Sequence, residues 1–274
     1  MAYVDPADTA GQFALPRMTS VVKALLVVNV ALALPFLFLY DAVPFVAQVH
    51  NALALNVPMW RELAPWLPLW QVFTYGFLHS AHEPMHLLGN LIGLYFFGTW
   101  LESLLGPRRF LLIYGLGIVV PGVLQLLVAL LFGQSLLVVG ASGAVLLLVV
   151  AMATLRPQAM VIVLFIPVRL WLVATVYVGL DLFGLVRGAG GAAHLVHLGG
   201  AALGFALAKS GALWWDPWAA AAARKEARRQ ASAAEDEARL DQLLERIHKQ
   251  GIGSLSDRER EFLKRMSGRR SGGL

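Results

Sequence analysis

Long apolar runs, separated by short polar stretches, make up most of residues 21–213. A helix of about 20 apolar residues crosses the ~30 Å hydrocarbon core of a bilayer, so each run is a candidate membrane span. The pattern predicts an all-α membrane protein with six transmembrane helices. These helices are expected at residues 21–39, 84–105, 110–132, 137–155, 168–186 and 192–213.

Two other stretches are apolar or aromatic without fitting this pattern. Residues 157–167 form an apolar run that is too short to span, so we expect an interfacial segment or a bent connection there. Residues 48–83 form a long outer loop rich in tryptophan and proline, which is typical of structure lying partly in the bilayer.

The composition supports a membrane domain followed by a water-facing tail. The chain is 58% hydrophobic and only 14% charged, which excludes an ordinary soluble domain. Residues 1–213 hold nine Lys and Arg residues, whereas residues 214–274 hold 13. We therefore expect a cytoplasmic N-terminal segment at 1–20, a six-helix membrane domain at 21–213 and a charged cytoplasmic helical tail at 214–274. The absence of cysteine excludes disulfides and thiolate metal sites.

Positive charges predict the orientation of the membrane domain, because cytoplasmic loops carry an excess of Lys and Arg. The cations on one side are Arg17, Lys23, Arg108, Arg109, Arg156, Arg169 and Lys209. The opposite side carries Arg61 and Arg187. Both termini are therefore expected in the cytoplasm, with the protein in the cell (inner) membrane. This asymmetry and the basic tail account for the net charge of +5, so no nucleic-acid partner is expected.

The tail shows the periodicity of an amphipathic helix. Leu240, Leu243, Leu244 and Ile247 recur at helical spacing, which predicts a helix over residues 219–249. After the glycines at 251 and 253, Ser254 or Ser256 is a candidate cap for a second, short helix. The tail is either an element that binds a protein partner or a solvated spacer.

Three polar side chains inside apolar segments are predicted to share one layer of the membrane. At ~1.5 Å per helical residue, Ser142 lies ~21 Å from the charged residues on the cytoplasmic side, and Asn90 and His197 lie ~18 Å from them. Buried polar groups are costly in a bilayer and are therefore functional candidates. The alternative for Ser142 is helix packing, because Gly140 and Ala144 form a small-xxx-small pattern around it.

Such a layer offers the groups needed for acyl transfer. A serine hydroxyl needs a base within hydrogen-bond reach, most often a histidine, and the oxyanion that forms needs donors already in place. His86 and Asn90 are four residues apart, so they share one helix face. Gly140 and Gly143 would let a substrate strand approach the backbone of Ser142 closely.

These motifs, in this order, resemble the rhomboid family of intramembrane serine proteases, including bacterial members that carry a short helical hairpin on the tail. The similarity covers most of residues 70–213. The residues that carry it are Gly140-Ala141-Ser142-Gly143, His86 with Asn90, His197 with Gly200 and Gly204, and the pattern Gly98, Glu102, Gly106, Arg109, Phe110 and Tyr114. The chain departs from the family pattern at Leu146 and Leu147, which replace an aromatic residue and a glycine.

The resemblance implies a six-helix bundle that cleaves single-span membrane proteins in the outer half of the bilayer, without a cofactor. It implies Ser142 as nucleophile and His197 as general base, acting as a dyad without a carboxylate. His86, Asn90 and the backbone N–H of Ser142 would form the oxyanion hole. The family places glycines three and seven residues after the catalytic histidine, and this spacing selects His197 rather than His194.

Three other functions stay open at this point. His82, Glu83 and His86 match the zinc signature His-Glu-x-x-His, which requires both histidines on one regular helix. Pro84 argues against this interpretation, because proline belongs in the first turn of a helix and would leave His82 on the preceding loop; we therefore expect no metal. A catalytically silent rhomboid-like membrane chaperone is the second alternative. A small-solute transporter that uses the same polar layer is the third, and the sequence disfavours it because it has no evident inverted repeat.

Overall fold

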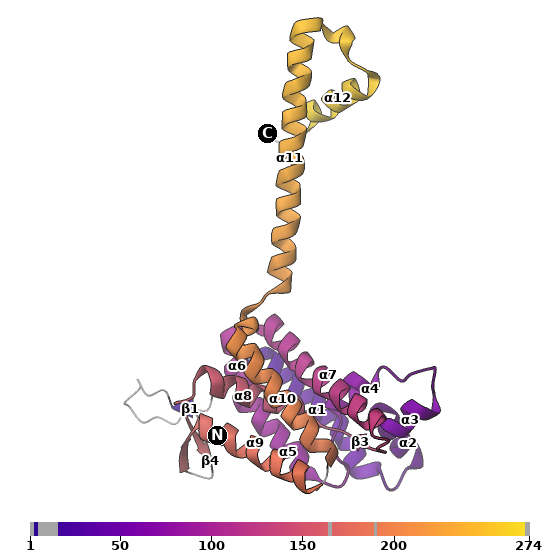
Figure 1. Ribbon diagram of the computed structural model, residues 1–274, viewed down its shortest axis with the longest axis vertical. Coiled ribbons are helices and arrows are strands. Elements are labelled where there is room, and N and C mark those ends of the chain that lie inside the picture. The colour runs from indigo at the N-terminus through magenta and orange to yellow at the C-terminus, as the bar shows by residue number, and fades with distance from the viewer. Residues whose placement is uncertain (1–2, 5–15, 164–165, 189–190, 272–274) are drawn as a thin grey trace. The chain divides into compact units, whose positions relative to one another are not determined.

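The computed structural model describes residues 3–4, 16–163, 166–188 and 191–271, which form two compact units, Met1–Trp215 and Asp216–Leu274. The prediction of an all-α membrane fold is confirmed (Figure 1). The long helices of the first unit are α1 (Ser20–Leu39), α5 (Pro84–Gly93) continued by the π-helical turn η2 (Leu94–Gly98) and α6 (Thr99–Leu105), α7 (Pro107–Leu131), α8 (Ser142–Leu155), α9 (Leu170–Arg187) and α10 (Gly191–Ser210).

These helices correspond to the six predicted segments, with one clear difference in length. Among the residues that the structure describes, three of these helices, α1, α7 and α9, are by length and composition able to cross a membrane on their own. Helix α8 has 14 residues and begins at Ser142 rather than at residue 137. Gly140 stops it from starting earlier, because its φ of 124° is incompatible with a right-handed helix. The number of complete spans stays a prediction.

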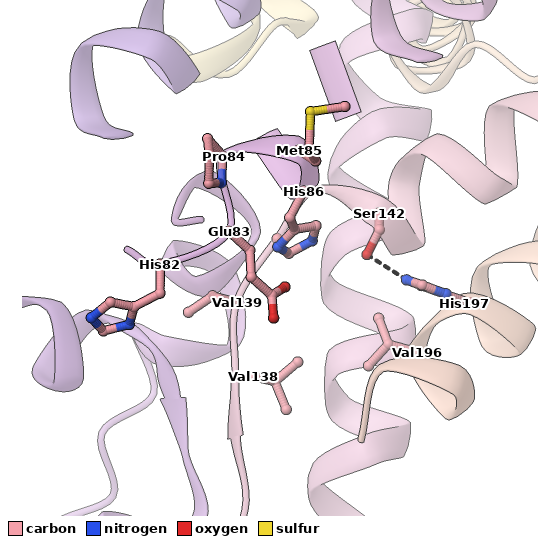
Figure 2. A pocket seen from close by; sticks show the side chains of 11 residues that line it. His82, Glu83, Pro84, Met85, His86, Val138, Val139, Ser142, Val196 and His197 are labelled. Carbon is pink, nitrogen blue, oxygen red and sulfur yellow. Dashed lines mark hydrogen bonds between the residues drawn. The ribbon is translucent and has the colours of Figure 1, made fainter. Parts of the chain in front are cut away.

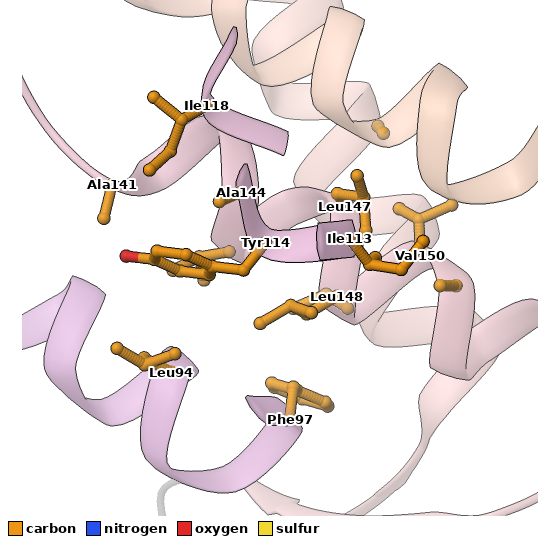
Figure 3. Close-up of a cluster of buried hydrophobic side chains, with 14 of the residues drawn as sticks. Leu94, Phe97, Ile113, Tyr114, Ile118, Ala141, Ala144, Leu147, Leu148 and Val150 are labelled. Atoms are coloured by element: carbon orange, nitrogen blue, oxygen red, sulfur yellow. The ribbon is translucent and has the colours of Figure 1, made fainter. Parts of the chain in front are cut away.

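Helix α8 is the centre of the membrane unit. Its residues are apolar all round, and the side chains from Gly143 to Ala153 are all buried, as expected for a helix surrounded by other helices. Figure 3 shows the contact on one side, where Leu94 and Phe97 of η2 and Tyr114 of α7 pack around Leu148 of α8. The short central helix therefore places its first residue, Ser142, half-buried within the bundle.

Glycines bring α8 and α10 into backbone contact. A Cβ atom on Gly200 of α10 would collide with the carbonyl group of Gly143 on α8. One turn further, a Cβ on Gly204 would collide with the carbonyl oxygen of Leu147. Helices in membranes associate closely where small residues let their backbones approach. The glycines that follow His197 thus fix its helix directly against the helix of Ser142.

The loop between α1 and α5 folds into short helices, α2 (Pro44–Leu53), α3 (Val57–Glu62), α4 (Gln71–Thr74) and the 3₁₀ turn η1 (Tyr75–Phe77). The fully buried amide of Gln71 ties them together. Its oxygen accepts hydrogen bonds from the Asn56 backbone N–H at 3.0 Å and from the Trp60 indole at 2.9 Å, and its nitrogen donates to the Ala52 carbonyl at 3.0 Å. Strand β2 (Leu55–Asn56) of the same loop pairs antiparallel with β3 (Leu137–Val138), just before α8.

The short apolar stretch at 157–167 contains strands rather than helix. Strand β4 (Met160–Val163) pairs antiparallel with β5 (Ile166–Arg169), in the register Met160↔Arg169. Strand β1 (Tyr3–Val4) adds to the free edge of β4. The bent connection expected between the fourth and fifth segments is therefore a small sheet.

A carboxylate from α6 caps the beginning of α1. Glu102 is buried, and it accepts hydrogen bonds from the backbone N–H groups of Val21 and Val22, at 3.1 and 2.9 Å, and from the hydroxyls of Thr19 and Ser20. The first N–H groups of a helix have no partner within the helix, and the helix dipole favours a negative charge beside them. Glu102 thus satisfies the end of a helix about 80 residues earlier in the chain.

The tail unit is a helical hairpin of α11 (Pro217–Gln250) and α12 (Asp257–Ser271), with Leu240, Leu243, Leu255 and Phe262 at its core. Of the two candidate caps, Ser256 precedes α12, and its N–H and hydroxyl both bond to Glu259, each at 2.9 Å. These hydrogen bonds, with an ion pair to Arg246 at 2.8 Å, hold the pKa of Glu259 below its usual range.

Candidate active site

Ser142 occupies the first position of α8, where a helix carries unpaired N–H groups. The chain reaches it through the extended residues of β3 and a sharp turn at Gly140. A developing negative charge beside the Ser142 backbone would therefore meet free N–H donors and the positive end of the helix dipole. The backbone at the start of α8 is therefore suited to stabilise an anion that forms beside Ser142.

His197 of α10 lies directly against the Ser142 hydroxyl. The Oγ atom of Ser142 is 2.7 Å from Nε2 of His197. Figure 2 marks this hydrogen bond with a dashed line. The hydroxyl donates in this hydrogen bond when Nε2 carries no proton, which is the arrangement in which an imidazole can act as a base. The structure thus brings together the two residues that the sequence predicts as nucleophile and base.

Asp181 of α9 contacts the other side of the His197 ring. Its Oδ1 atom is 2.9 Å from Nδ1 of His197 and 2.7 Å from Nδ1 of His194. The family resemblance implies a dyad without a carboxylate, whereas this structure places one beside the histidine. Sequence reasoning missed this position, although a signal was present: Asp181 is the one acidic residue in the apolar segment 168–186, and ionisable residues inside membrane segments usually have functional partners.

A cavity of about 540 Å³ opens beside the Ser142 hydroxyl. Figure 2 shows Glu83 and His86 on one wall and Ser142 with His197 on the other. Its lining residues are His82, Glu83, Pro84, Met85, His86, Val138, Val139, Gly140, Ser142, Val196 and His197. A cavity with apolar walls and a few converging polar groups is the usual form of a binding site.

The predicted oxyanion donors occupy different places. His86 of α5 lines the cavity, whereas Asn90 is buried and is not among the lining residues. The Nδ2 atom of Asn90 donates instead to the His86 carbonyl of its own helix, at 2.9 Å. The structure therefore brings His86 and the Ser142 backbone to the cavity, while Asn90 lies one helical turn behind His86.

The two glycines predicted to admit substrate also differ in position. Gly140 lines the cavity, and its missing side chain leaves room for the His86 ring. Gly143 packs on the opposite side, where a Cβ atom would lie 2.9 Å from Cγ1 of Val196 and 3.1 Å from the Gly117 carbonyl oxygen. Gly140 thus shapes the site itself, and Gly143 allows close helix packing behind it.

We expect the Gly140→Ala variant to react about 10-fold or more slowly with a fluorophosphonate, a serine-reactive probe, because loss of one oxyanion donor costs about 10²–10³-fold. The new Cβ would lie 2.7 Å from Nε2 of His86, at a φ of 124° that strains any side chain. The measurement is the second-order labelling rate of Ser142 in detergent. Gly89→Ala is the matched control, since among the described residues no group outside the local helix backbone lies within 4 Å of a Cβ there. Equal labelling rates for Gly140→Ala and wild type would contradict the conclusion that Gly140 leaves the space that the His86 ring needs.

The groups of the zinc signature do not converge. Helix α5 begins at Pro84, as the proline argument predicts, so His82 and Glu83 precede it. The His82 ring is exposed and bonds to Asp41 at 3.1 Å. Among the residues that the structure describes, the one group of three metal-type ligands is Asp181, His194 and His197.

Comparison with known proteins places this site in a family context. Residues 67–212 match the Rhomboid domain, and residues 226–269 match a family of unknown function (DUF6576). Presenilin-associated rhomboid-like protein A, mitochondrial, of Danio rerio is 33% identical over 135 residues, which cover 46% of this chain and 33% of that protein. RHOMBOID-like protein 12, mitochondrial, of Arabidopsis thaliana is 32% identical over 133 residues, which cover 43% of this chain and 40% of that protein. The matched region thus spans less than half the length of these curated relatives.

Proposed function

Since this chain belongs to the rhomboid family, we propose that it is an intramembrane serine endopeptidase with Ser142 as its nucleophile and His197 as its general base. One observation carries the proposal: the Ser142 hydroxyl bonds to Nε2 of His197 at 2.7 Å, at the N-terminus of a buried helix and beside a cavity. A serine with only a structural role would need neither the bond to a histidine, nor the position at a helix N-terminus, nor the neighbouring cavity.

The first half of the reaction transfers an acyl group to the enzyme. Oγ of Ser142 attacks the scissile carbonyl carbon while Nε2 of His197 takes the hydroxyl proton. The carbonyl oxygen becomes an oxyanion, which the Ser142 backbone N–H and His86 are placed to stabilise, with Asn90 supporting His86 through its backbone. The C–N bond then breaks, and Nε2 of His197 returns the proton to the leaving amine.

The second half restores the enzyme with water. His197 takes a proton from a water molecule, whose oxygen attacks the acyl carbon, and the new oxyanion forms in the same place. When this intermediate collapses, Oγ of Ser142 leaves and receives the proton from His197. The reaction consumes one water molecule and requires no cofactor.

The substrate class and the membrane follow from the same proposal. By the family resemblance, single-span membrane proteins are the expected substrates, cut in the outer half of the bilayer. The position of Ser142 at the beginning of a helix too short to span supports a cut within the bilayer. The distribution of Lys and Arg supports a location in the cell inner membrane with both termini in the cytoplasm. The tail hairpin is a candidate binding element for a protein partner.

The test uses the purified full chain in liposomes with a model single-span substrate. We expect wild type to cleave it, with or without a metal chelator, and Ser142→Ala to leave it intact. Loss of wild-type cleavage on chelation would point to a metalloprotease instead. Binding of the substrate without cleavage by any version would favour the catalytically silent, chaperone-like alternative.

A further inference from the structure

Asp181 receives two imidazole hydrogen bonds at a single carboxylate oxygen. The Nδ1 atoms of His194 and His197 lie 2.7 and 2.9 Å from its Oδ1. The carboxylate side chain is 10% exposed, and the two rings are 24% and 21% exposed. A charged group so deep in an apolar segment is costly unless its hydrogen bonds compensate, so this arrangement requires both partners.

We propose that Asp181 is a positioning residue for the catalytic base, with His194 as its second hydrogen-bond donor. This inference rests on the proposed function and deepens it, by adding a carboxylate and a helper histidine to the pair of Ser142 and His197.

The hydrogen-bond geometry fixes the tautomer of His197. An ionised carboxylate only accepts hydrogen bonds, so the Nδ1 atom facing Asp181 must carry the proton. The neutral ring then has its lone pair on Nε2, which is the atom 2.7 Å from the Ser142 hydroxyl. When His197 takes the serine proton, it becomes an imidazolium whose positive charge lies beside the Asp181 carboxylate. Asp181 thus selects the active tautomer before the reaction and stabilises the charge that develops during it.

His194 completes the support of the carboxylate. It lies three residues before His197 on α10, so both rings face α9 from one side of the helix. Gly184, three residues after Asp181 on α9, leaves the space for the His194 ring, because a Cβ there would collide with it. An aspartate with one donor would be less well compensated in this apolar setting. The hydrogen bond from His194 thus holds the Asp181 carboxylate in place beside His197.

The alternative is that these hydrogen bonds only hold α9 against α10 and have no part in catalysis. A structural connection predicts lower stability on substitution, with no change in the pH dependence of turnover. A positioning role predicts a changed pH dependence in a protein that is still folded. The titratable groups around His197 are Asp181 from α9, His194 from its own helix and His86 from α5, with Glu83 across the cavity.

The experiment compares Asp181→Asn, Asp181→Glu and His194→Gln with wild type, using the full chain in detergent and the model single-span substrate. Removal of the triad carboxylate in a serine protease costs about 10⁴-fold in kcat, and we expect Asp181→Asn to lose about 10²-fold or more, with KM changed little. Asp181→Glu should recover part of this loss, and His194→Gln should lose less than Asp181→Asn. The acid limb of the pH–rate profile should move to lower pH in Asp181→Asn, because an amide stabilises the imidazolium less than a carboxylate does.

A second readout does not depend on turnover. Nitrogen NMR of histidine-labelled protein reports which ring nitrogen of His197 carries the proton, and we expect Nδ1–H in wild type and a mixture of tautomers in Asp181→Asn. This measurement tests the inference even if no substrate is cleaved, so its failure is distinct from failure of the proposed function.

Three results would overturn the inference. The first is an Asp181→Asn variant with kcat within threefold of wild type. The second is a loss of activity that follows the loss of thermal stability, with no change in the pH profile or in the His197 tautomer. The third is inhibited substrate cleavage by the wild-type protein that a chelator restores. That result would make Asp181, His194 and His197 the ligands of a metal ion.

Discussion

Replacing His197 by alanine is expected to reduce both substrate cleavage and fluorophosphonate labelling of Ser142 by about 10⁴-fold or more, the range seen when a serine protease loses its base. The physical reason is the 2.7 Å hydrogen bond from Oγ to Nε2. Without a base in contact, the hydroxyl keeps its proton and is a poor nucleophile. Labelling is measured by intact-protein mass spectrometry, and cleavage by gel electrophoresis of the model substrate.

Other histidines of the chain provide the comparison for this variant. His194→Ala should retain labelling at a reduced rate, since the His194 ring contacts Asp181 and not the serine. His248→Ala should match wild type, because His248 is exposed on α11 of the tail. If His194→Ala lost all labelling while His197→Ala retained it, the base would be assigned to the wrong histidine.

Gly200→Ala is also expected to have a large effect, through the contact between α8 and α10. The added methyl would overlap the Gly143 carbonyl, and adding volume to a well-packed contact typically costs about 1–3 kcal/mol. The two helices can relieve this overlap only by separating. A misplacement of about 1 Å at an active site can cost about 10²-fold in rate, so we expect a loss of that size in kcat. The thermal unfolding temperature should fall as well.

A glycine in open surroundings serves as the matched control. Gly179 lies within α9, and no atom lies within 4 Å of a Cβ built there, so Gly179→Ala should unfold at or above the wild-type temperature because alanine favours helix. Gly200→Ala with wild-type stability and turnover would show that the backbones of α8 and α10 do not need to touch.

The sequence predicts much of this fold because the membrane restricts the choices. The length of the apolar runs locates the helices in the sequence, and Pro84 correctly predicts the start of α5. The start of α8 was misplaced, since residues 137–141 are as apolar as the helix that follows. What excludes them is the φ of 124° at Gly140, whose N–H bonds to the Tyr75 carbonyl far away in the sequence, at 3.0 Å. The sequence does not predict the strands at 160–169, because a short apolar run fits a strand and a helix equally well.

The candidate site, like the fold, could be predicted from the sequence only in part. Ser142 and His197 could be selected by motif and by helix depth, and the structure brings them into contact. Asp181 could be noticed as a lone charge but not paired, because α9 is apolar on every side and its periodicity does not reveal which face meets α10. The position of Asn90 behind His86 depended on side-chain geometry that spacing alone does not supply.

The cap that Glu102 provides for α1 implies an order of assembly. During synthesis, α1 emerges about 80 residues before the carboxylate that completes its N-terminus. Until then, the N–H groups of Val21 and Val22 must be solvated by water at the membrane surface. Only when α6 has inserted and packed beside α1 can Glu102 replace that water. Helix α1 is therefore made before α6, but its N-terminus is completed only after α6 has packed beside it.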